Sequence, residues 1–172
     1  MIEGRITRVS GPVIHALGLG GAGLYDVVEV GEKRLAGEII KTDAKGATIQ
    51  VYEENTGMRP GEPVYSLGRP LSALLGPGIM GSIYDGIQRP LSALKAVSGD
   101  FLVPGVKGDC LDPAKRWHYV PALREGDRIG PGSLIGRVQE TSVVEHRVLA
   151  PPTIRPSLLA SSVPEGDYTI EE

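Results

Sequence analysis

This chain of 172 residues has only one cysteine. It has no long apolar run and no apolar stretch at its N-terminus. The single cysteine, Cys110, excludes an internal disulfide framework and favours a reducing, cytoplasmic setting. No apolar run approaches the roughly 20 residues that a membrane helix needs. The first residues, MIEGRITRVSG, lack the apolar core of a secretory signal. We therefore expect no direct membrane insertion.

A strong charge of either sign is also missing. The formal net charge is −3, and acidic and basic residues are interspersed along the chain. Proteins that bind nucleic acid carry a basic patch or stripe that neutralises phosphates. The charge pattern therefore predicts that nucleic acid is not a partner.

The chain lacks a phosphate-binding loop of the pattern G-x-x-x-x-G-K-[ST]. In that loop, backbone N–H groups surround the phosphates, the lysine reaches the terminal ones and the hydroxyl binds Mg²⁺. No Gly-Lys pair occurs in the sequence. We therefore expect no site for a nucleoside triphosphate, and we assign no catalytic, cofactor-binding or metal-binding residue. The lysines are Lys33, Lys41, Lys45, Lys95, Lys107 and Lys115.

Gly18, Gly20 and Gly23 match G-x-G-x-x-G, which in dinucleotide-binding proteins ends a strand and opens a helix. The residues that follow, LYDVVEV, alternate as a strand does. The acidic residue expected about 20 positions later would be Asp43, which falls in a predicted hairpin turn. The pattern therefore predicts a loop and no dinucleotide site.

Metal and nucleophile chemistry have little support. His15, His118 and His146 lie far apart in sequence, and no pair has the spacing of a metal site. Cys110 and His118 could form a nucleophile pair, but no orienting third group is nearby in sequence. A small buried thiol is the simpler interpretation of Cys110. We predict no metal site.

Trp117 and Tyr119 alternate with Arg116 and His118. One interpretation is a half-buried strand. The other is a protein-contact surface, because exposed tryptophan and arginine anchor many interfaces. The sequence alone leaves both open.

The fold class is predicted to be mainly β. The 24 glycines and 14 prolines suit short strands joined by tight turns. Before residue 70 the β-rich runs are short and turn-bounded, and they favour a small closed six-stranded barrel, because closure removes exposed strand edges. Asp43–Gly46 is expected to form a hairpin turn. The expected strands are 3–9, 13–16, 25–30, 34–42, 47–53 and 63–67.

The hexapeptide RPLSAL occurs twice, at 69–74 and at 89–94. Each copy is interpreted as a helix start with proline at the first helical position. The second copy predicts the better helix, since Leu91, Leu94 and Val97 share one face. Gly99 is expected to cap its end. A short helix is therefore predicted between two β regions.

Residues 100–172 predict a second β unit, with EGD at 125–127 and again at 165–167. GDRIGPGSLIGRVQE and VLAPP resemble elements of the barrel-sandwich hybrid fold of lipoyl and biotinyl domains, in reverse chain order. Those carrier domains attach their cofactor to a lysine at a hairpin tip, and the expected tip, residues 140–145, has none. A carrier function is therefore not predicted. The expected strands are 116–120, 133–139, 145–149 and 158–163.

The stretch LGPGIMGSIYDGIQRPL at 75–91 is the most specific pattern in the chain. Together with GEII, IQVYEENTG and GEPV in the β region before it, the stretch resembles the opening of the catalytic A subunit of V-type and archaeal-type rotary ATPases. The resemblance covers essentially the whole chain, although 98–115 fits only loosely. Its other parts are 2–14, 25–41 and 48–72.

The resemblance implies three parts. Residues 1–70 would be the barrel that joins A and B subunits in an A3B3 ring. Residues 71–99 would be a linker with a short helix that starts a nucleotide-binding domain. Residues 100–172 would be an inserted bulge that contacts peripheral stalk or regulatory subunits.

The resemblance also implies that a domain binding ATP or ADP with Mg²⁺ follows Glu172, so that this chain is the front of a longer subunit. The intact subunit would be an enzyme that couples ATP hydrolysis or synthesis to H⁺ or Na⁺ transport. It would lie in the cytoplasm, peripheral to the membrane, while this chain alone would carry no catalytic residue. Leu75–Ser98 is expected to pack poorly without that domain. The alternative is a stand-alone β-rich module that binds a protein or small ligand.

Overall fold

The computed structural model describes residues 2–43, 46–99, 101 and 103–172. The chain forms two compact units. The first contains Met1–Ala73 and Leu91–Gly108, and the second contains Leu74–Pro90 and Asp109–Glu172. Most regular structure is β, with one short helix in the described part of the chain, so the predicted fold class is confirmed. The functional division into 1–70, 71–99 and 100–172 stays a prediction.

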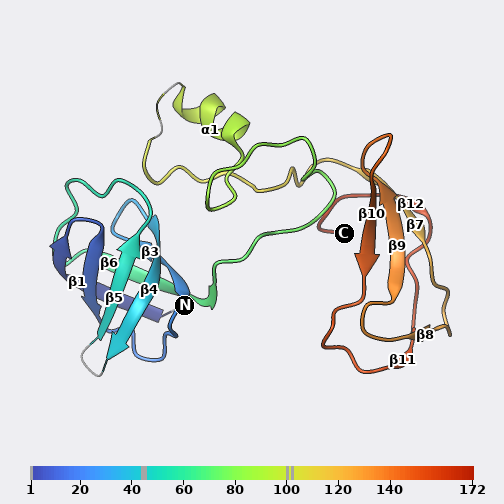
Figure 1. The fold of residues 1–172 in the computed structure, drawn as a ribbon, viewed down its shortest axis with the longest axis horizontal. Helices are drawn as coiled ribbons and strands as arrows, with labels where there is room; N and C mark the ends of the chain where they lie inside the picture. The colour runs from blue at the N-terminus through green and yellow to red at the C-terminus, as the bar shows by residue number, and fades with distance from the viewer. Residues whose placement is uncertain (1, 44–45, 100, 102) are drawn as a thin grey trace. The chain divides into compact units, whose positions relative to one another are not determined.

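The first unit contains a closed barrel in the strand order β1-β2-β5-β4-β3-β6 (Figure 1). Every neighbouring pair is antiparallel, and the β1–β6 pair closes the ring. The predicted closed six-stranded barrel is therefore confirmed, and each strand lies within a few residues of its expected position. The strands are β1 (Ile2–Ser10), β2 (Val13–Leu17), β3 (Asp26–Val30), β4 (Leu35–Asp43), β5 (Gly46–Val51) and β6 (Pro63–Pro70).

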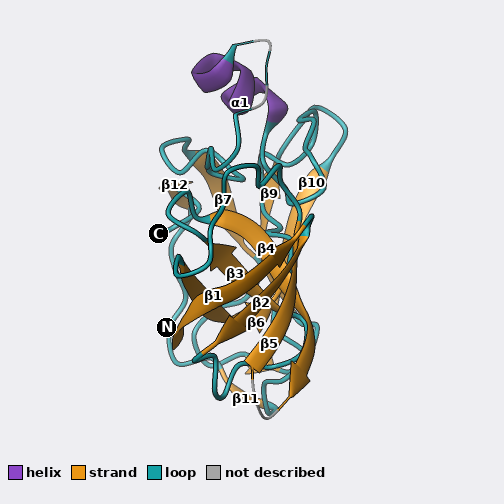
Figure 2. Ribbon diagram, turned by 90° about the vertical axis from the view of Figure 1, so that its left-hand side faces the viewer, coloured by secondary structure: helices purple, strands orange, loops and turns teal. Residues whose placement is uncertain are grey.

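The barrel closes around an apolar core because its strands alternate inward and outward residues. In β4, Leu35 and Ile39 are buried while Glu38 between them is not. Ile14 of β2 and Ile49 of β5 are a directly opposite pair on neighbouring strands, and both are fully buried. Irregular register in β1, β3 and β4 bends these strands, and they cross the barrel obliquely in Figure 2.

Two predicted turns can be followed in the barrel. Asp43 pairs with Gly46, whose N–H donates to Asp43 Oδ1 at 3.0 Å. The turn residues 44 and 45 lie outside the described residues. Gly18 has a φ of +88°, and β3 begins at Asp26 with no helix between them, so the G-x-G-x-x-G segment is a loop as predicted.

The two RPLSAL copies fold differently. The second forms α1 (Leu91–Ser98), with Leu94 buried, and the N–H of Gly99 donates to the Lys95 carbonyl at 2.9 Å. This helix and its cap are confirmed. The helix predicted at 69–74 is wrong, because Pro70 ends β6 opposite Asp26. The glycines and proline of Gly76-Pro77-Gly78 then leave too few residues for a helix.

The second unit contains a four-stranded sheet in the order β10-β9-β7-β12 and a two-stranded sheet of β11 and β8. Three of the predicted strands are confirmed to within one residue. The strand predicted at 158–163 is wrong, because only Ser157 and Leu158 pair, and Ser162 instead donates its hydroxyl to the Leu123 carbonyl. The strands are β7 (Trp117–Pro121), β8 (Arg128–Ile129), β9 (Leu134–Gln139), β10 (Glu145–Leu149), β11 (Ser157–Leu158) and β12 (Gly166–Tyr168).

Candidate assembly surfaces

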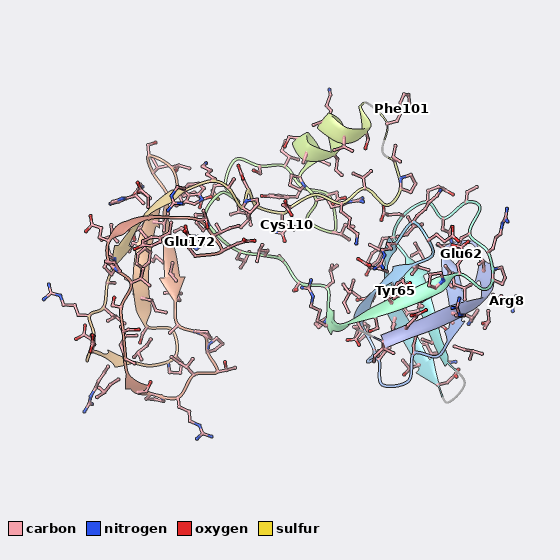
Figure 3. All side chains as sticks on the ribbon, turned by 180° about the vertical axis from the view of Figure 1, so that it is seen from behind. Arg8, Glu62, Tyr65, Phe101, Cys110 and Glu172 are labelled. Atoms are coloured by element: carbon pink, nitrogen blue, oxygen red, sulfur yellow. The ribbon has the colours of Figure 1, made fainter. Side chains whose placement is uncertain are left out.

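The residues singled out for metal or nucleophile chemistry do not gather into a site. His15 lies in β2, His118 in β7 and His146 in β10. Across residues 2–43, 46–99, 101 and 103–172, no three His, Cys, Asp or Glu side chains form a group that could hold a metal ion. Cys110 is a free, half-buried thiol of the second unit (Figure 3).

After the helix, the chain returns to the barrel as a strap, which we define as residues 103–108. The Glu53 carboxylate accepts hydrogen bonds from Ala36 N–H at 3.2 Å and Gly105 N–H at 3.0 Å, which joins the strap to β4. A Cβ on Gly105 would lie 2.6 Å from the Lys33 carbonyl oxygen, and Gly105 has a φ of +82°. Glycine is therefore required where the strap meets the barrel.

An ion cluster holds the other end of the strap. Lys107 contacts Glu29, and Arg34 Nη1 lies 2.7 Å from the second oxygen of the same carboxylate. Partial burial raises the pKa of Glu29, but the hydrogen bonds from Lys107 and Arg34 outweigh that effect and lower its pKa. The Arg34 guanidinium also lies 4.4 Å from the ring centre of Tyr65, which is a cation–π contact. Figure 3 labels Tyr65 on the barrel.

Exposed apolar side chains concentrate between residues 71 and 103, a stretch that we call the apolar segment. Phe101 is 83% exposed, and Ile83 and Val97 are each 72% exposed (Figure 3 labels Phe101). Leu74–Pro90 belong to the second unit and Leu91–Gly108 to the first, so each unit carries its own share of these side chains. Large apolar side chains exposed on a unit mark sites for partners. The other exposed members are Leu71, Leu74, Leu75, Met80, Leu91 and Val103.

The part of the apolar segment in the second unit is held by polar anchors. Gln88 accepts from Leu74 N–H at 2.6 Å and donates to the Leu74 carbonyl at 2.7 Å, with its own backbone at φ +62°. Glu140 Oε1 accepts from both Gly78 N–H and Met80 N–H at 2.8 Å. Hydrogen bonds from the Gln88 and Glu140 side chains to backbone groups therefore fix this loop while its apolar side chains stay exposed.

A mainly apolar groove of about 660 Å³ lies in the second unit. Trp117 lines it but is only 9% exposed, so the half-buried strand interpretation is confirmed and Trp117 is not an exposed anchor. A protein contact by the exposed residues of this strand stays a prediction. The Trp117 indole Nε1 has no hydrogen-bond partner among the described residues. The Lys115 ammonium lies 4.0 Å from the centre of the indole ring. The remaining apolar lining includes Leu75, Leu111, Ile135, Val148 and Tyr168.

His118 of β7 contacts carboxylates of β12 and of the residue before it, on the exposed face of the sheet. Its Nδ1 lies 3.0 Å from Asp167 Oδ1, and its Nε2 lies 3.2 Å from Glu165 Oε1. The Asp167 carboxylate first, and Glu165 second, raise the pKa of His118. The partners of His118 are thus carboxylates that favour its charged form.

None of the helices in the described part of the chain is long and apolar enough to cross a membrane.

Two family matches agree with the two β units. Residues 6–68 match the beta-barrel domain of the ATP synthase alpha/beta family, and residues 108–172 match the ATP synthase alpha/beta subunit barrel-sandwich domain. Together the two matches define the class of the chain as an ATP synthase alpha/beta-type subunit. The chain belongs to the ATP synthase alpha/beta family, on the branch of the V-type and A-type A subunits.

Relatives on that branch match along nearly the whole chain. The V-type ATP synthase alpha chain of Clostridium botulinum (strain Hall) is 49% identical over 99% of this chain and 28% of its own length. The A-type ATP synthase subunits A of Thermococcus sp. (strain KI) and Hyperthermus butylicus are 49% and 50% identical over 98% and 99% of this chain. The chain spans 29% of the length of each of those two relatives.

Proposed function

We propose that this chain is the assembly module of the A subunit of a V/A-type rotary ATP synthase. In this proposal the barrel meets neighbouring B subunits in an A3B3 ring, and residues 100–172 meet peripheral stalk or regulatory subunits. The parent subunit binds ATP or ADP with Mg²⁺ and couples hydrolysis or synthesis to H⁺ or Na⁺ transport. Its place is the cytoplasmic head of the complex, peripheral to the membrane.

The single observation that carries the proposal is the apolar segment. Four of its side chains, Leu75, Ile83, Val97 and Phe101, are more than seven-tenths exposed. Exposing apolar surface costs about 25 cal/mol per Å² relative to burying it, so such a stretch favours a covering partner. The similarity to A subunits over almost the whole chain supports the identity of that partner as the rest of a rotary ATPase head.

Sedimentation with purified B subunit of an A-type ATP synthase tests the assembly role. We expect the chain to co-sediment with the B subunit and Leu24→Glu, an exposed barrel change, to weaken that binding. Leu158→Glu, an exposed change in the second unit, is the matched control and should bind as the unaltered chain does. Equal weakening by both changes would contradict a barrel-based contact.

Hydrogen exchange tests whether the linker, residues 71–99, packs poorly in this chain. We expect amides in Leu75–Ser98 to exchange much faster than those of the barrel strands, because the segment holds few buried side chains. Protection equal to that of β4 would count against the proposal.

Calorimetry with Mg-ATP tests whether this chain lacks the nucleotide site of the proposed parent subunit. The chain has no Gly-Lys-Ser or Gly-Lys-Thr, so we expect no heat of binding. A site of about micromolar affinity would contradict this expectation.

The groove of the second unit supports one alternative, a stand-alone module that binds a small apolar ligand. Its volume of about 660 Å³ lies in the range of ligand sites. The reading frame downstream of the codon for Glu172 separates the two proposals. A G-x-x-x-x-G-K-[ST] motif there would decide for the ATP synthase subunit.

A further inference from the structure

The exposed face of the second unit's four-stranded sheet carries two arginines side by side. In β9, Arg137 is exposed while its neighbour Val138 is buried. Arg147 of β10 is directly opposite Arg137 in the register, so both guanidinium groups stand on the same face. Val120 of β7, which is 40% exposed, is directly opposite Arg137 on its other side. We call Val120, Arg137, Glu145 and Arg147 the arginine face.

One carboxylate serves both arginines. Glu145 Oε2 lies 3.5 Å from Arg137 Nη1, and Glu145 Oε1 lies 3.2 Å from Arg147 Nε. Like charges directly opposite each other on paired strands destabilise the pair. Glu145 can offset only one of the two positive charges, and each guanidinium has five N–H donors. The trio therefore keeps a net positive charge and spare donors.

The rest of this face is electrically paired. His118 lies between the carboxylates of Asp167 and Glu165, and Arg116 contacts the Asp167 carbonyl and the Glu172 carboxylate. Within the described residues of this sheet, the excess positive charge therefore lies on the β9 and β10 side. The Arg137 and Arg147 side chains are 52% and 67% exposed, so a partner can reach them.

We propose that the arginine face docks an acidic segment of a protein partner, with a carboxylate of the partner bridging Arg137 and Arg147. Arginine suits this task because its planar fork binds carboxylates in two parallel hydrogen bonds. Val120 offers an apolar contact beside the bridge. The inference rests on the proposed function, which gives residues 100–172 a protein partner, and it names the chemistry of that partner.

An acetylated hexaglutamate peptide is the probe, added to the isotope-labelled chain while backbone NMR shifts are recorded at low salt. We expect shifts confined to β9 and β10, and affinity about fivefold lower for Arg137→Gln or Arg147→Gln. Arg128→Gln and Arg155→Gln, exposed arginines elsewhere in the unit, are the matched controls and should bind as the unaltered chain does.

A second measurement separates docking from a structural role. Arg147→Gln leaves Glu145 paired with Arg137 and removes the like-charge opposition, so the melting temperature should stay constant or rise. A structural arginine would instead lower the melting temperature when removed.

Three outcomes would overturn the inference. They are no saturable binding up to about 10 mM peptide, equal weakening by Arg128→Gln, and equal affinity for an oligothymidylate, which would show a general polyanion site. The double variant Arg137→Gln/Arg147→Gln should still sediment with the B subunit. If the unaltered chain does not sediment with the B subunit, the proposed function is contradicted. The peptide experiment then still decides whether the arginine face binds an acidic segment.

Discussion

The barrel and the second unit are both built from short antiparallel strands, but they bury their side chains differently. In the barrel, Ile14, Ile39 and Ile49 are fully buried inside a ring that has no edge strand. The second unit's four-stranded sheet ends in the edge strands β10 and β12. Its most buried apolar residues in the described chain are Leu111, Trp117, Val138 and Ala150. The comparison teaches that the closed barrel has a core of its own, whereas the second unit has fewer buried apolar side chains and relies more on polar anchors such as Glu140.

Core truncation should show the difference most strongly. Ile39→Ala should lower the free energy of unfolding of the barrel by about 4 kcal/mol, because it opens a cavity in a closed core. Leu111→Ala should lower that of the second unit by about 2.5 kcal/mol, because its surroundings can collapse more easily. Urea unfolding followed by NMR reports each unit separately.

The exposed residue Leu158 provides the control for this pair. Leu158→Ala should change stability by less than about 0.5 kcal/mol. If Ile39→Ala and Leu111→Ala cost the same, or if both units unfold in one shared transition, the contrast between the units is wrong.

Overpacking tests how tightly the second unit is filled. A Cβ on Gly136 would run into the ring of Tyr119, whose hydroxyl donates to the Ile135 carbonyl at 3.2 Å. Gly136→Ala should therefore destabilise the second unit by about 2 kcal/mol in thermal unfolding. A Cβ on Gly130 would meet nothing within 4 Å, so Gly130→Ala is the matched control. A neutral Gly136→Ala would mean that this sheet face is loosely packed.

The Glu140 anchor should have a smaller and local effect. Glu140→Ala removes the acceptor of two backbone N–H groups, those of Gly78 and Met80, and should cost about 1.5 kcal/mol. Hydrogen exchange at residues 78–80 should accelerate, while the barrel amides stay unchanged. Glu125→Ala, at an exposed position, is the comparison variant. Unchanged exchange at residues 78–80 would show that the hydrogen bonds of Glu140 do not stabilise this loop.

The pH response of His118 should be the smallest effect. Asp167 and then Glu165 raise its pKa in the folded state above the ordinary 6.5. The stabilisation is therefore complete below pH 6.5 and is lost as pH rises through the higher folded pKa. NMR titration should locate that pKa, and His118→Gln should flatten the pH dependence of second-unit stability in this window. Because the pair is exposed, added salt should weaken the effect. A folded pKa at or below the ordinary value would contradict it.

The barrel could be predicted because its strands carry their own pattern. Alternation in β4, where Leu35 and Ile39 face inward, is visible in the sequence without any partner. The hexapeptide RPLSAL shows that a local sequence pattern does not always determine the secondary structure. The same six residues finish a strand at Pro70 and begin a helix at Leu91. Neighbours in space and the glycines that follow decided between the two outcomes.

The anchoring residues could not be predicted, because their bonds join distant parts of the chain. Glu53 binds Gly105, and Glu140 binds Gly78, with more than fifty residues between donor and acceptor. A single carboxylate that accepts backbone N–H groups has no periodicity or spacing for a sequence pattern to detect. The paired arginines were equally hidden, since Arg137 and Arg147 meet only through the β9–β10 register.

The strand β1 pairs with β2 on one side and with β6 on the other. Removal of Ile2–Ser10 by proteolysis would therefore affect both neighbouring strands. It would turn β2 and β6 into two unpaired edges and uncover Ile14 and Val64. The expected product is an open five-stranded sheet whose two edges can pair with other chains, so β1 protects the barrel against aggregation as well as completing its core.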